Sequence, residues 1–299
     1  MSIVVLGTVA LDNVSTPSGE RKDILGGSAV HFAIVSRLFT DVHLVAVVGK
    51  DFPRRNIAFL RQKGIYLNSL EQNNGETFKW SGKYKGDMNV AQTLNTHLGV
   101  LATFRPVISQ KERNIKNIFL ANVDPHIQRH LLAQMSHPHL VGLDSMNYWI
   151  THERKTFLSL LHKVNIYVAN DQEARELSGE SNLIKAAQFL HAHGPDMVLI
   201  KKGEHGVFLY SQKFIFALPA YPVEKVIDPT GAGDTFAGAF MGYLSKVNKL
   251  TTARIKKAIA YGTIAASFNV EGFGTEETAR LTLKDLGYRL ARFKKYVSF

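Results

Sequence analysis

Short apolar runs alternate with amphipathic segments along almost the whole chain, and this alternation restricts the fold more than any other feature of the sequence. The runs carry β-branched residues and end at Gly, Asn or Asp, as expected of buried strands followed by loops. The apolar runs cover residues 3–6, 44–48, 118–121, 140–143, 166–168 and 197–200. Helical patterns cover residues 29–38, 54–63, 153–162, 183–193, 235–247, 253–268 and 283–293. The alternation predicts an α/β fold of βαβ units around a largely parallel sheet, with ligands bound beyond the carboxyl ends of the strands.

Two polar stretches interrupt this alternation. Residues 13–24 and about 65–100 are rich in Thr, Asn, Gly and Lys, and residues 77–84 alternate between apolar and polar side chains. Such a pattern is typical of exposed antiparallel strands, so we expect a small separate sheet; an ordinary surface hairpin is the alternative. Because the sequence contains neither an internal repeat nor an interdomain linker, residues 1–299 are expected to form a single domain.

Composition excludes several classes of protein. The 299 residues are 45% apolar and include no cysteine, so disulfides and thiolate–metal sites are excluded, and a cytoplasmic location is expected. The sequence has no secretory pattern, and no apolar run approaches the roughly 18 residues of a membrane span. The net charge of +11 is compatible with a nucleic-acid partner, but the basic residues are dispersed. Their one cluster consists of Arg289, Arg292, Lys294 and Lys295. A nucleic-acid partner is therefore not favoured.

The most informative motif spans residues 228–240 and reads Asp-Pro-Thr-Gly-Ala-Gly-Asp-Thr-Phe-Ala-Gly-Ala-Phe. Gly231, Ala232 and Gly233 precede an apolar, helix-forming run. A helix that begins near Gly233 would offer backbone N–H groups and the positive end of its dipole to an anion. Asp234 would lie in the first turn, where it suits a general base if the anion is a phosphoryl group. The alternative is an acidic residue near an ordinary helix N-cap.

This motif closely resembles the signature of the ribokinase-like (PfkB) family of sugar and nucleoside kinases, and other family landmarks follow in order along nearly the full chain. The resemblance implies a three-layer α/β/α sandwich with a mostly parallel central sheet, in which the two polar stretches form a small β lid. It also implies that the amides of Gly231, Ala232 and Gly233 stabilise the transferring γ-phosphate and that Asp234 is the catalytic base. ATP and Mg²⁺ are the cofactors that it implies.

Gly27, Ser28 and His31 belong to the stretch Gly-Gly-Ser-Ala-Val-His-Phe-Ala from residue 26, which resembles the family's N-terminal double-glycine motif. Adjacent glycines let the backbone approach a ligand closely, so these residues are expected to bind the acceptor substrate. Many relatives have an Asn at the position of His31, where it hydrogen-bonds sugar hydroxyls. His is bulkier and has fewer hydrogen-bonding options, so that sugar preference does not transfer. A satisfied histidine on a helix face is the alternative.

Asp12 lies five residues after the strand-ending Gly7, at the position of an Asp that in relatives binds two substrate hydroxyls. Ribokinase has an Asn two residues before that Asp, where this chain has Ala10, and this departure argues against ribose. Asp124, at the end of another predicted strand, is a further candidate to accept hydrogen bonds from the substrate. An unspecialised loop Asp is the alternative in each case.

Asn170 and Glu173 resemble the family's Asn-x-x-Glu motif, and a carboxylate there suits Mg²⁺ held mostly through water. They also fit a capping box at a helix start, and both roles are compatible. Lys201, Gly203 and Gly206 lie in a stretch that resembles the strand and turn along the nucleotide. Most relatives have a small hydroxylated residue where Lys201 stands, and a lysine there could reach a phosphate.

The sequence therefore predicts an ATP-dependent kinase that phosphorylates a hydroxymethyl group of a sugar or nucleoside. Phe78, Trp80 and Tyr84 in the lid could stack on a base, although aromatic residues are also ordinary in sheets. One alternative is a sugar-phosphate kinase, for which the candidate phosphate ligands are Lys83, Lys85 and Arg105. The other is a non-catalytic protein of the same fold that binds nucleotide or nucleic acid.

Two expectations stay open. Asp228 and Thr230 lie where some relatives hold K⁺, so activation by a monovalent cation is undecided from the sequence. The exposed edges of the lid sheet allow a homodimer, because unpaired strand edges favour pairing with another chain.

Overall fold

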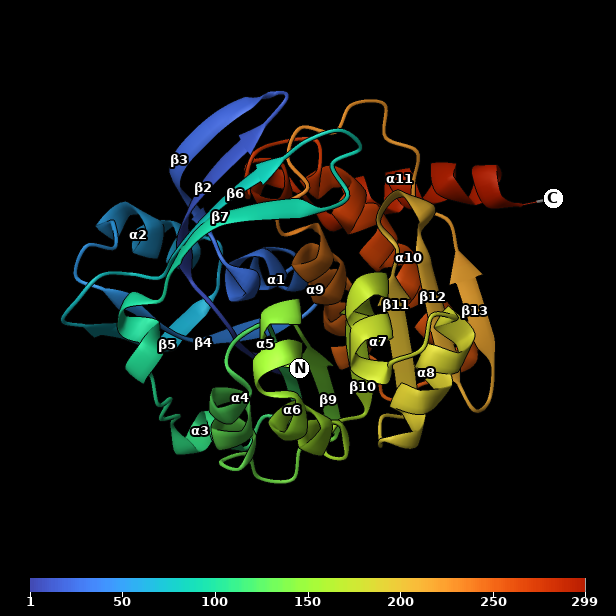
Figure 1. Ribbon diagram of the computed structural model, residues 1–299, viewed down its shortest axis with the longest axis horizontal. Helices are drawn as coiled ribbons and strands as arrows, with labels where there is room; N and C mark the ends of the chain where they lie inside the picture. Colours follow the sequence, from blue (N-terminus) through green and yellow to red (C-terminus); the bar gives the residue numbers. More distant parts are fainter. Residues whose placement is uncertain (299) are drawn as a thin grey trace.

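A computed structural model describes residues 1–298, so the last residue of the expected 1–299 domain lies outside the described residues. Its centre is a nine-stranded sheet, shown in Figure 1. In spatial order the strands are β13 (Ile215–Leu218), β12 (Val207–Ser211), β11 (Met197–Lys201), β10 (Ile166–Asn170), β9 (Leu140–Asp144), β8 (Asn117–Leu120), β1 (Ser2–Leu6), β4 (Asp41–Gly49) and β5 (Tyr66–Asn73). The pairs from β11 to β5 are parallel, whereas β12 runs antiparallel to both its neighbours.

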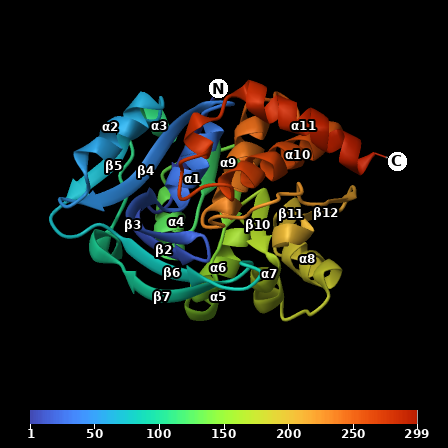
Figure 2. The same ribbon diagram turned by 90° about the horizontal axis from the view of Figure 1, so that it is seen from above.

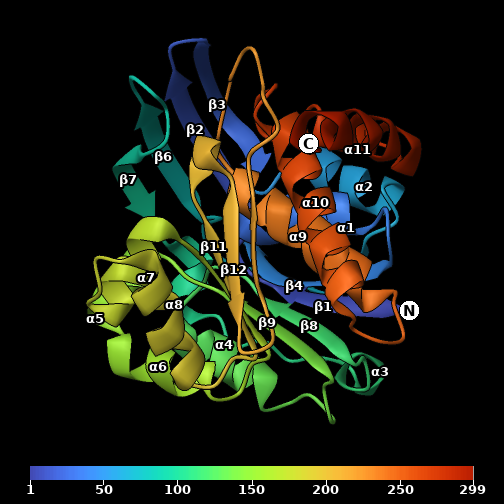
Figure 3. The same ribbon diagram turned by 90° about the vertical axis from the view of Figure 1, so that its right-hand side faces the viewer.

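Helices cover both faces of this sheet, as Figure 3 shows. One face carries α1 (Ser28–Ser36), α2 (Arg54–Gln62), α9 (Ala232–Ser245), α10 (Thr252–Asn269) and α11 (Leu283–Val297). The other carries α4 (Pro125–Leu132), α5 (Asn147–His152), α6 (Arg154–Leu161), α7 (Asp171–Ser178) and α8 (Leu183–Ala192). The remaining short helices are η1 (Gly99–Thr103), α3 (Gln110–Arg113), η2 (Gly203–His205) and η3 (Thr278–Arg280). This is the predicted three-layer α/β/α sandwich, which the structure confirms.

Two apolar cores explain the sequence pattern. One core lies between the sheet and the α1 side, the other between the sheet and the α4 side. The central strands are therefore buried on both faces and read as continuous apolar runs instead of alternating ones. Helix α1 is buried along its whole length, because it packs between the sheet and α9.

A second, four-stranded sheet forms the lid at the edge of the large sheet where the parallel strands end (Figure 1, Figure 2). Its order is β3 (Gly19–Gly26), β2 (Ala10–Thr16), β6 (Lys79–Tyr84) and β7 (Ala91–His97). The lid strands thus extend beyond the expected 13–24 segment and occupy only the later part of the expected 65–100 segment. The earlier part, β5, belongs to the large sheet, where it pairs with β4.

The lid is packed against the body of the molecule. Val14, Tyr84 and Met88 of the lid segments form one buried cluster with Phe273, which follows α10. The guanidinium of Arg21 lies 4.5 Å above the Phe273 ring. These contacts hold the lid over the carboxyl ends of the strands. Among residues 1–298, no helix combines the length and the apolar character needed to cross a bilayer.

Candidate active site

The glycine-rich motif forms the turn that opens α9. Gly231 precedes the helix with φ 74°, in the left-handed region that glycine adopts without strain. The carboxylate of Asp228 braces the turn by accepting the Thr230 N–H at 2.9 Å and the Gly274 N–H at 3.0 Å. The N–H of Ala232, one of the expected anion donors, donates to a carbonyl of the turn at 3.1 Å. The first-turn N–H groups that follow have no helical acceptor and lie at the positive end of the helix dipole.

Asp234 lies half-buried in the first turn of α9, as the motif predicts. Burial raises the pKa of its carboxyl to about 7, and the negative charge of Asp144 adds to the rise, while Lys201 opposes it. A carboxyl that titrates near neutral pH is suited to accept a proton during a reaction. The environment of Asp234 therefore keeps its carboxyl in the pH range where it can gain or lose a proton.

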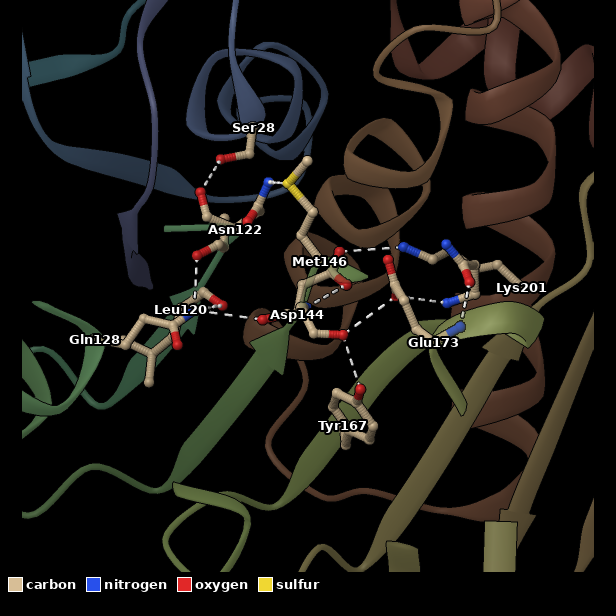
Figure 4. A network of polar contacts seen from close by, with 12 residues as sticks. Ser28, Leu120, Asn122, Gln128, Asp144, Met146, Tyr167, Glu173 and Lys201 are labelled. Carbon is tan, nitrogen blue, oxygen red and sulfur yellow. Dashed lines mark hydrogen bonds and ion pairs between the residues drawn. The ribbon is translucent and has the colours of Figure 1, made fainter. Parts of the chain in front are cut away.

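Lys201 at the end of β11 reaches across to β9. Its ammonium lies 3.1 Å from the carboxylate of Asp144, and both side chains are largely buried (Figure 4). A Cβ atom at Gly233 would lie only 2.9 Å from the same ammonium. The lysine nitrogen is therefore directly beside the glycine-rich turn, where it adds a fixed positive charge to the helix terminus.

Glu173 lies in the first turn of α7, where it forms the expected capping box with Asn170. Its carboxylate accepts the Asn170 N–H at 2.9 Å and the Ser145 hydroxyl at 3.2 Å, and that hydroxyl lies 2.8 Å from the Tyr167 hydroxyl. Burial raises the pKa of Glu173 to about 8, with a further contribution from Asp144. This network joins β9, β10 and α7 beside the lysine pair, as Figure 4 shows.

The donor set beside Lys201 suits a magnesium ion. The negative charge of Asp144 raises the pKa of both Glu173 and Asp234, and a divalent cation would relieve this repulsion. In residues 1–298 they do not converge as three direct ligands of one ion. Mg²⁺ usually retains several waters and takes other ligands from nucleotide phosphates. The arrangement is compatible with that mode of binding.

Asp12 on lid strand β2 is buried, with its carboxylate against Gly26 at the end of β3. Burial raises the pKa of its carboxyl to about 7, and the charges of Asp228 and Asp234 raise it further, while the N–H groups of Gly27 and Trp80 lower it. The electrostatic coupling to Asp234 shows that the two carboxyls share one region. The structure thus brings the expected substrate ligand close to the expected base.

His31 on α1 packs against the glycine-rich turn itself. A Cβ atom at Gly231 would lie 2.4 Å from the His31 ring, and the ring is only 1% exposed. Neither ring nitrogen makes a hydrogen bond of ordinary geometry within residues 1–298, although the Asn269 side chain lies close to the ring. Burial lowers the pKa of the ring, against the opposing effects of Asp228 and Asn269. A buried imidazole therefore lies next to the left-handed glycine, with the Asn269 side chain beside it.

The Ser28 side chain is buried, and its hydroxyl is hydrogen-bonded within the protein. Its hydroxyl accepts the Thr8 N–H at 3.1 Å, lies 3.2 Å from the Thr8 hydroxyl and donates to the Asn122 carbonyl at 3.1 Å. These bonds join the loops after β1 and β8 to the start of α1. Gly27 is the N-cap of the same helix, with φ 96°. The start of α1 therefore lies next to Asp12, to which the Gly27 N–H donates a hydrogen bond.

Asp124 is the one expected substrate residue whose carboxylate is engaged in a helix cap. It is the N-cap of α4 and accepts the His126 N–H at 2.7 Å. This bond accounts for an acidic residue at that position, and no hydrogen bond or ion pair within residues 1–298 joins its carboxylate to Asp12 or Asp234. The structure therefore does not bring Asp124 into the charged cluster.

Gly203 and Gly206 bracket the short helix η2, and the Lys202 N–H closes the turn by donating to the Gly206 carbonyl at 2.8 Å. The tip of the lid reaches this turn, because the Asn89 amide donates to the Glu204 carboxylate at 2.9 Å. The expected nucleotide turn and the lid are therefore in direct contact.

Two residues that sequence analysis did not assign to the site are central to it. Asp144 pairs with Lys201, and the only sequence signal for it was an acidic residue that closes a buried strand. Asn269 at the end of α10 donates to the Thr230 carbonyl at 2.8 Å and accepts the Thr235 hydroxyl at 2.8 Å. No local pattern marks Asn269, because its partners lie more than thirty residues away.

Known proteins with a similar structure identify the fold class of this chain, and a family model identifies its family. The fold is that of ribokinase-like kinases: the aminoimidazole riboside kinase of Salmonella enterica, solved with aminoimidazole riboside and an ATP analog, matches with a TM-score of 0.77 at 20% identity, over 97% of this chain and 100% of that one. The model of the pfkB family carbohydrate kinases matches residues 3–281. The chain belongs to the pfkB family, whose members are phosphotransferases with an alcohol group as acceptor.

The relatives include kinases for both nucleosides and sugars. The chain is 28% identical to the cytidine kinase of Thermococcus kodakarensis over 252 residues, which is 82% of this chain and 89% of the relative. It is 26% identical to the ribokinase of Haemophilus influenzae in an alignment of 305 positions that covers 93% of this chain and 94% of that protein. The chain is thus similar along most of its length to enzymes with two acceptor classes.

Proposed function

We propose that this protein is an ATP-dependent kinase that transfers the γ-phosphoryl group to a hydroxymethyl group of a sugar or nucleoside. The observation that carries the proposal is the position of Asp234: a carboxyl with a pKa near 7 in the first turn of α9, close to the charge of Lys201. A proton acceptor and a candidate anion site thus lie in the same helical turn. That combination serves phosphoryl transfer to an alcohol.

The triphosphate is proposed to lie along η2 and the start of α9. Lys201 supplies a permanent positive charge, since its ammonium is held by Asp144 and kept protonated by the surrounding carboxylates, which raise its pKa. Gly203 and Gly206 let the backbone turn close to the nucleotide, and Asn170 fixes the start of α7 beside it. Glu173 would hold Mg²⁺ through water, and the ion would neutralise charge on the phosphate oxygens.

The acceptor is proposed to lie between the lid and the glycine-rich turn. Asp12 would accept hydrogen bonds from two neighbouring hydroxyls, with Gly27, Ser28 and His31 shaping the wall of the same site. Because His31 is buried beside Gly231 and its ring nitrogens make no hydrogen bond of ordinary geometry within residues 1–298, it offers a hydrogen-bonding atom to a hydroxyl near the reacting centre. Asp124 is less suited to this role, since its carboxylate already caps α4.

Transfer would proceed by proton removal and in-line attack. Asp234 takes the proton of the attacking hydroxyl as its oxygen bonds to the γ-phosphorus, and the bond from that phosphorus to the bridging oxygen breaks, leaving ADP. The first-turn N–H groups after Gly231 and the Lys201 ammonium stabilise the charge that develops. The lid, closed over the site, excludes water that would otherwise compete as acceptor.

An ATP-consumption screen over sugars, sugar phosphates and nucleosides tests this proposal. We expect turnover with at least one unphosphorylated polyol that carries a hydroxymethyl group, and turnover slowed by about 10²- to 10⁴-fold in Asp234→Ala at the same protein concentration. Near-wild-type turnover in Asp234→Ala, or no acceptor from any of the three classes, would contradict the proposal. Comparing rates in K⁺ and Li⁺ salts tests the open prediction of a cation site at Asp228 and Thr230.

A further inference from the structure

One aromatic side chain of the lid lies flat against its own sheet. A Cβ atom at Gly82 would lie 2.0 Å and 2.3 Å from two ring atoms of Trp80, so the indole covers the Cα of that glycine. The indole N–H donates to the Thr93 hydroxyl at 3.2 Å, which fixes how the ring is turned on the sheet. Any residue larger than glycine at position 82 would lift the ring.

The ring faces the same side of the lid as the expected substrate ligand. In the parallel register of β2 and β6, Trp80 is directly opposite Asp12, and Gly82 is opposite Val14. Neighbouring residues in register point to the same face of a sheet. Val14 belongs to the buried cluster that packs against Phe273 beside the glycine-rich turn. Trp80 therefore leaves the sheet on the same inner face as Asp12, and its ring extends over Gly82 beside Val14.

The Trp80 side chain packs in part against the buried cluster of Val14, Tyr84, Met88 and Phe273, but it also keeps an exposed part. Trp80 is only partly buried, whereas its neighbour Tyr84 on the same strand is buried and has its hydroxyl against Thr230. Phe78, the third aromatic residue of this segment, packs instead into the core on the α4 side of the large sheet. Of the three lid aromatics, Trp80 alone combines an exposed surface with a place beside Asp12.

We propose that Trp80 is a stacking platform for the heterocyclic base of a nucleoside whose ribose hydroxyls are bound by Asp12. The inference rests on the proposed kinase function and names nucleosides as its acceptor class. A ring held flat against a sheet offers its other face to a planar partner, and a free sugar has no planar ring for that face. Alanine substitution at base-stacking positions weakens binding of the base by about 5- to 150-fold.

Fluorescence provides a readout that does not depend on turnover. The chain has two tryptophans, Trp80 and Trp149, and Trp149 lies on α5. In the Trp149→Phe protein, titration with cytidine or inosine should quench the emission of Trp80 saturably, and titration with ribose should not. In the reciprocal Trp80→Phe protein, the same nucleosides should leave the emission unchanged. Emission of Trp80 that does not respond to a nucleoside which the enzyme phosphorylates would overturn the inference.

Steady-state kinetics of matched variants provide a second, independent test of the Trp80 contact. Trp80→Ala should raise the KM for the nucleoside by about 10- to 100-fold with kcat within about 3-fold, and Trp80→Phe should recover most of that loss. Gly82→Ala should resemble Trp80→Ala, because its Cβ displaces the ring while its backbone does not need glycine. The control is Gly287→Ala, where a Cβ on α11 would meet nothing within 4 Å.

The outcomes separate the two proposals. If Trp80→Ala raises the KM for ribose and for cytidine equally, the ring contacts the sugar and the inference is wrong, although the kinase function stands. If neither ribose nor any nucleoside is phosphorylated, the proposed function fails for these acceptors, and quenching of Trp80 by nucleosides still decides whether the platform binds a base.

Discussion

The hydroxyl of Tyr84 lies 3.3 Å from that of Thr230, so a lid strand contacts the residue that precedes the glycine-rich turn. Burial of Tyr84 raises its pKa above the ordinary range, and the phenol therefore stays neutral. This contact joins two segments separated by 146 residues. Lid position and the shape of the anion site are thereby linked.

Replacing Tyr84 by Phe should test that link. The variant keeps the packed ring but leaves the Thr230 hydroxyl without its acceptor, which for a single neutral hydrogen bond costs about 0.5–1.5 kcal/mol. We expect a drop of roughly 2- to 10-fold in kcat/KM for the acceptor, together with faster ATP hydrolysis in its absence. Steady-state kinetics and an acceptor-free ATPase assay measure both. Unchanged values in both assays would mean that the contact does not control lid closure.

Removing the proposed base should slow turnover without weakening nucleotide binding. Asp234→Ala should lower kcat by about 10²- to 10⁴-fold, the usual contribution of a general base. Affinity for ATP should change little, since the carboxylate is assigned to the acceptor hydroxyl rather than to the phosphates. Steady-state kinetics measure kcat, and equilibrium titration with a non-hydrolysable ATP analog measures the affinity for the nucleotide. Near-wild-type turnover would remove Asp234 from this role.

The Lys201–Asp144 pair should contribute to stability as well as to nucleotide binding. Lys201→Met leaves the Asp144 carboxylate buried without its partner, and removal of one member of a buried pair typically costs about 3–5 kcal/mol. Because the Lys201 side chain is 18% exposed, we expect a loss at the lower end of that range. Lys201→Met should also raise the KM for ATP, because the triphosphate loses a positive charge. The double variant Lys201→Met, Asp144→Asn should recover part of the stability but keep the raised KM for ATP.

Urea unfolding and steady-state kinetics separate these two effects of Lys201→Met. The exposed Lys213→Met serves as the control for loss of one positive charge. If the single variant is as stable as the wild type, the pair is not a buried charge pair in solution. If its KM for ATP is unchanged, the lysine does not contact the triphosphate.

The raised pKa of Asp234 predicts a specific pH dependence of stability. Its pKa is about 7 in the folded protein and near 3.8 when unperturbed, so the folded state retains a proton that the unfolded state loses. Stability that depends on this carboxyl is therefore present below about pH 4 and is lost as the pH rises through 7. Asp234→Asn, which cannot ionise, should gain stability relative to wild type more at pH 8 than at pH 5. Melting temperatures of the two unliganded proteins across this range measure the difference, and a constant gap would contradict the prediction.

Much of the fold and part of the site could be predicted from the sequence, because those features depend on neighbours along the chain. The apolar runs gave the buried strands, and the glycine-rich stretch gave the start of α9 with Asp234 in its first turn. The capping box of Asn170 and Glu173 is likewise formed within one helical turn. Strands β12 and β13 and helix α4 were not predicted. Strand β5 was assigned to the lid, because it is a polar edge strand and nothing local distinguishes pairing with β4 from membership of the lid.

The sequence by itself determined the layered α/β fold and the family signature, since hydrophobic periodicity and turn chemistry act over a few residues. Only the tertiary structure decided that Lys201 pairs with Asp144, that the His31 ring lies against Gly231 and that Tyr84 meets Thr230. These pairs come from strands and helices far apart in the chain, and their contacts depend on strand order and on how the lid packs. The charge that surrounds the proposed base is therefore a property of the folded protein.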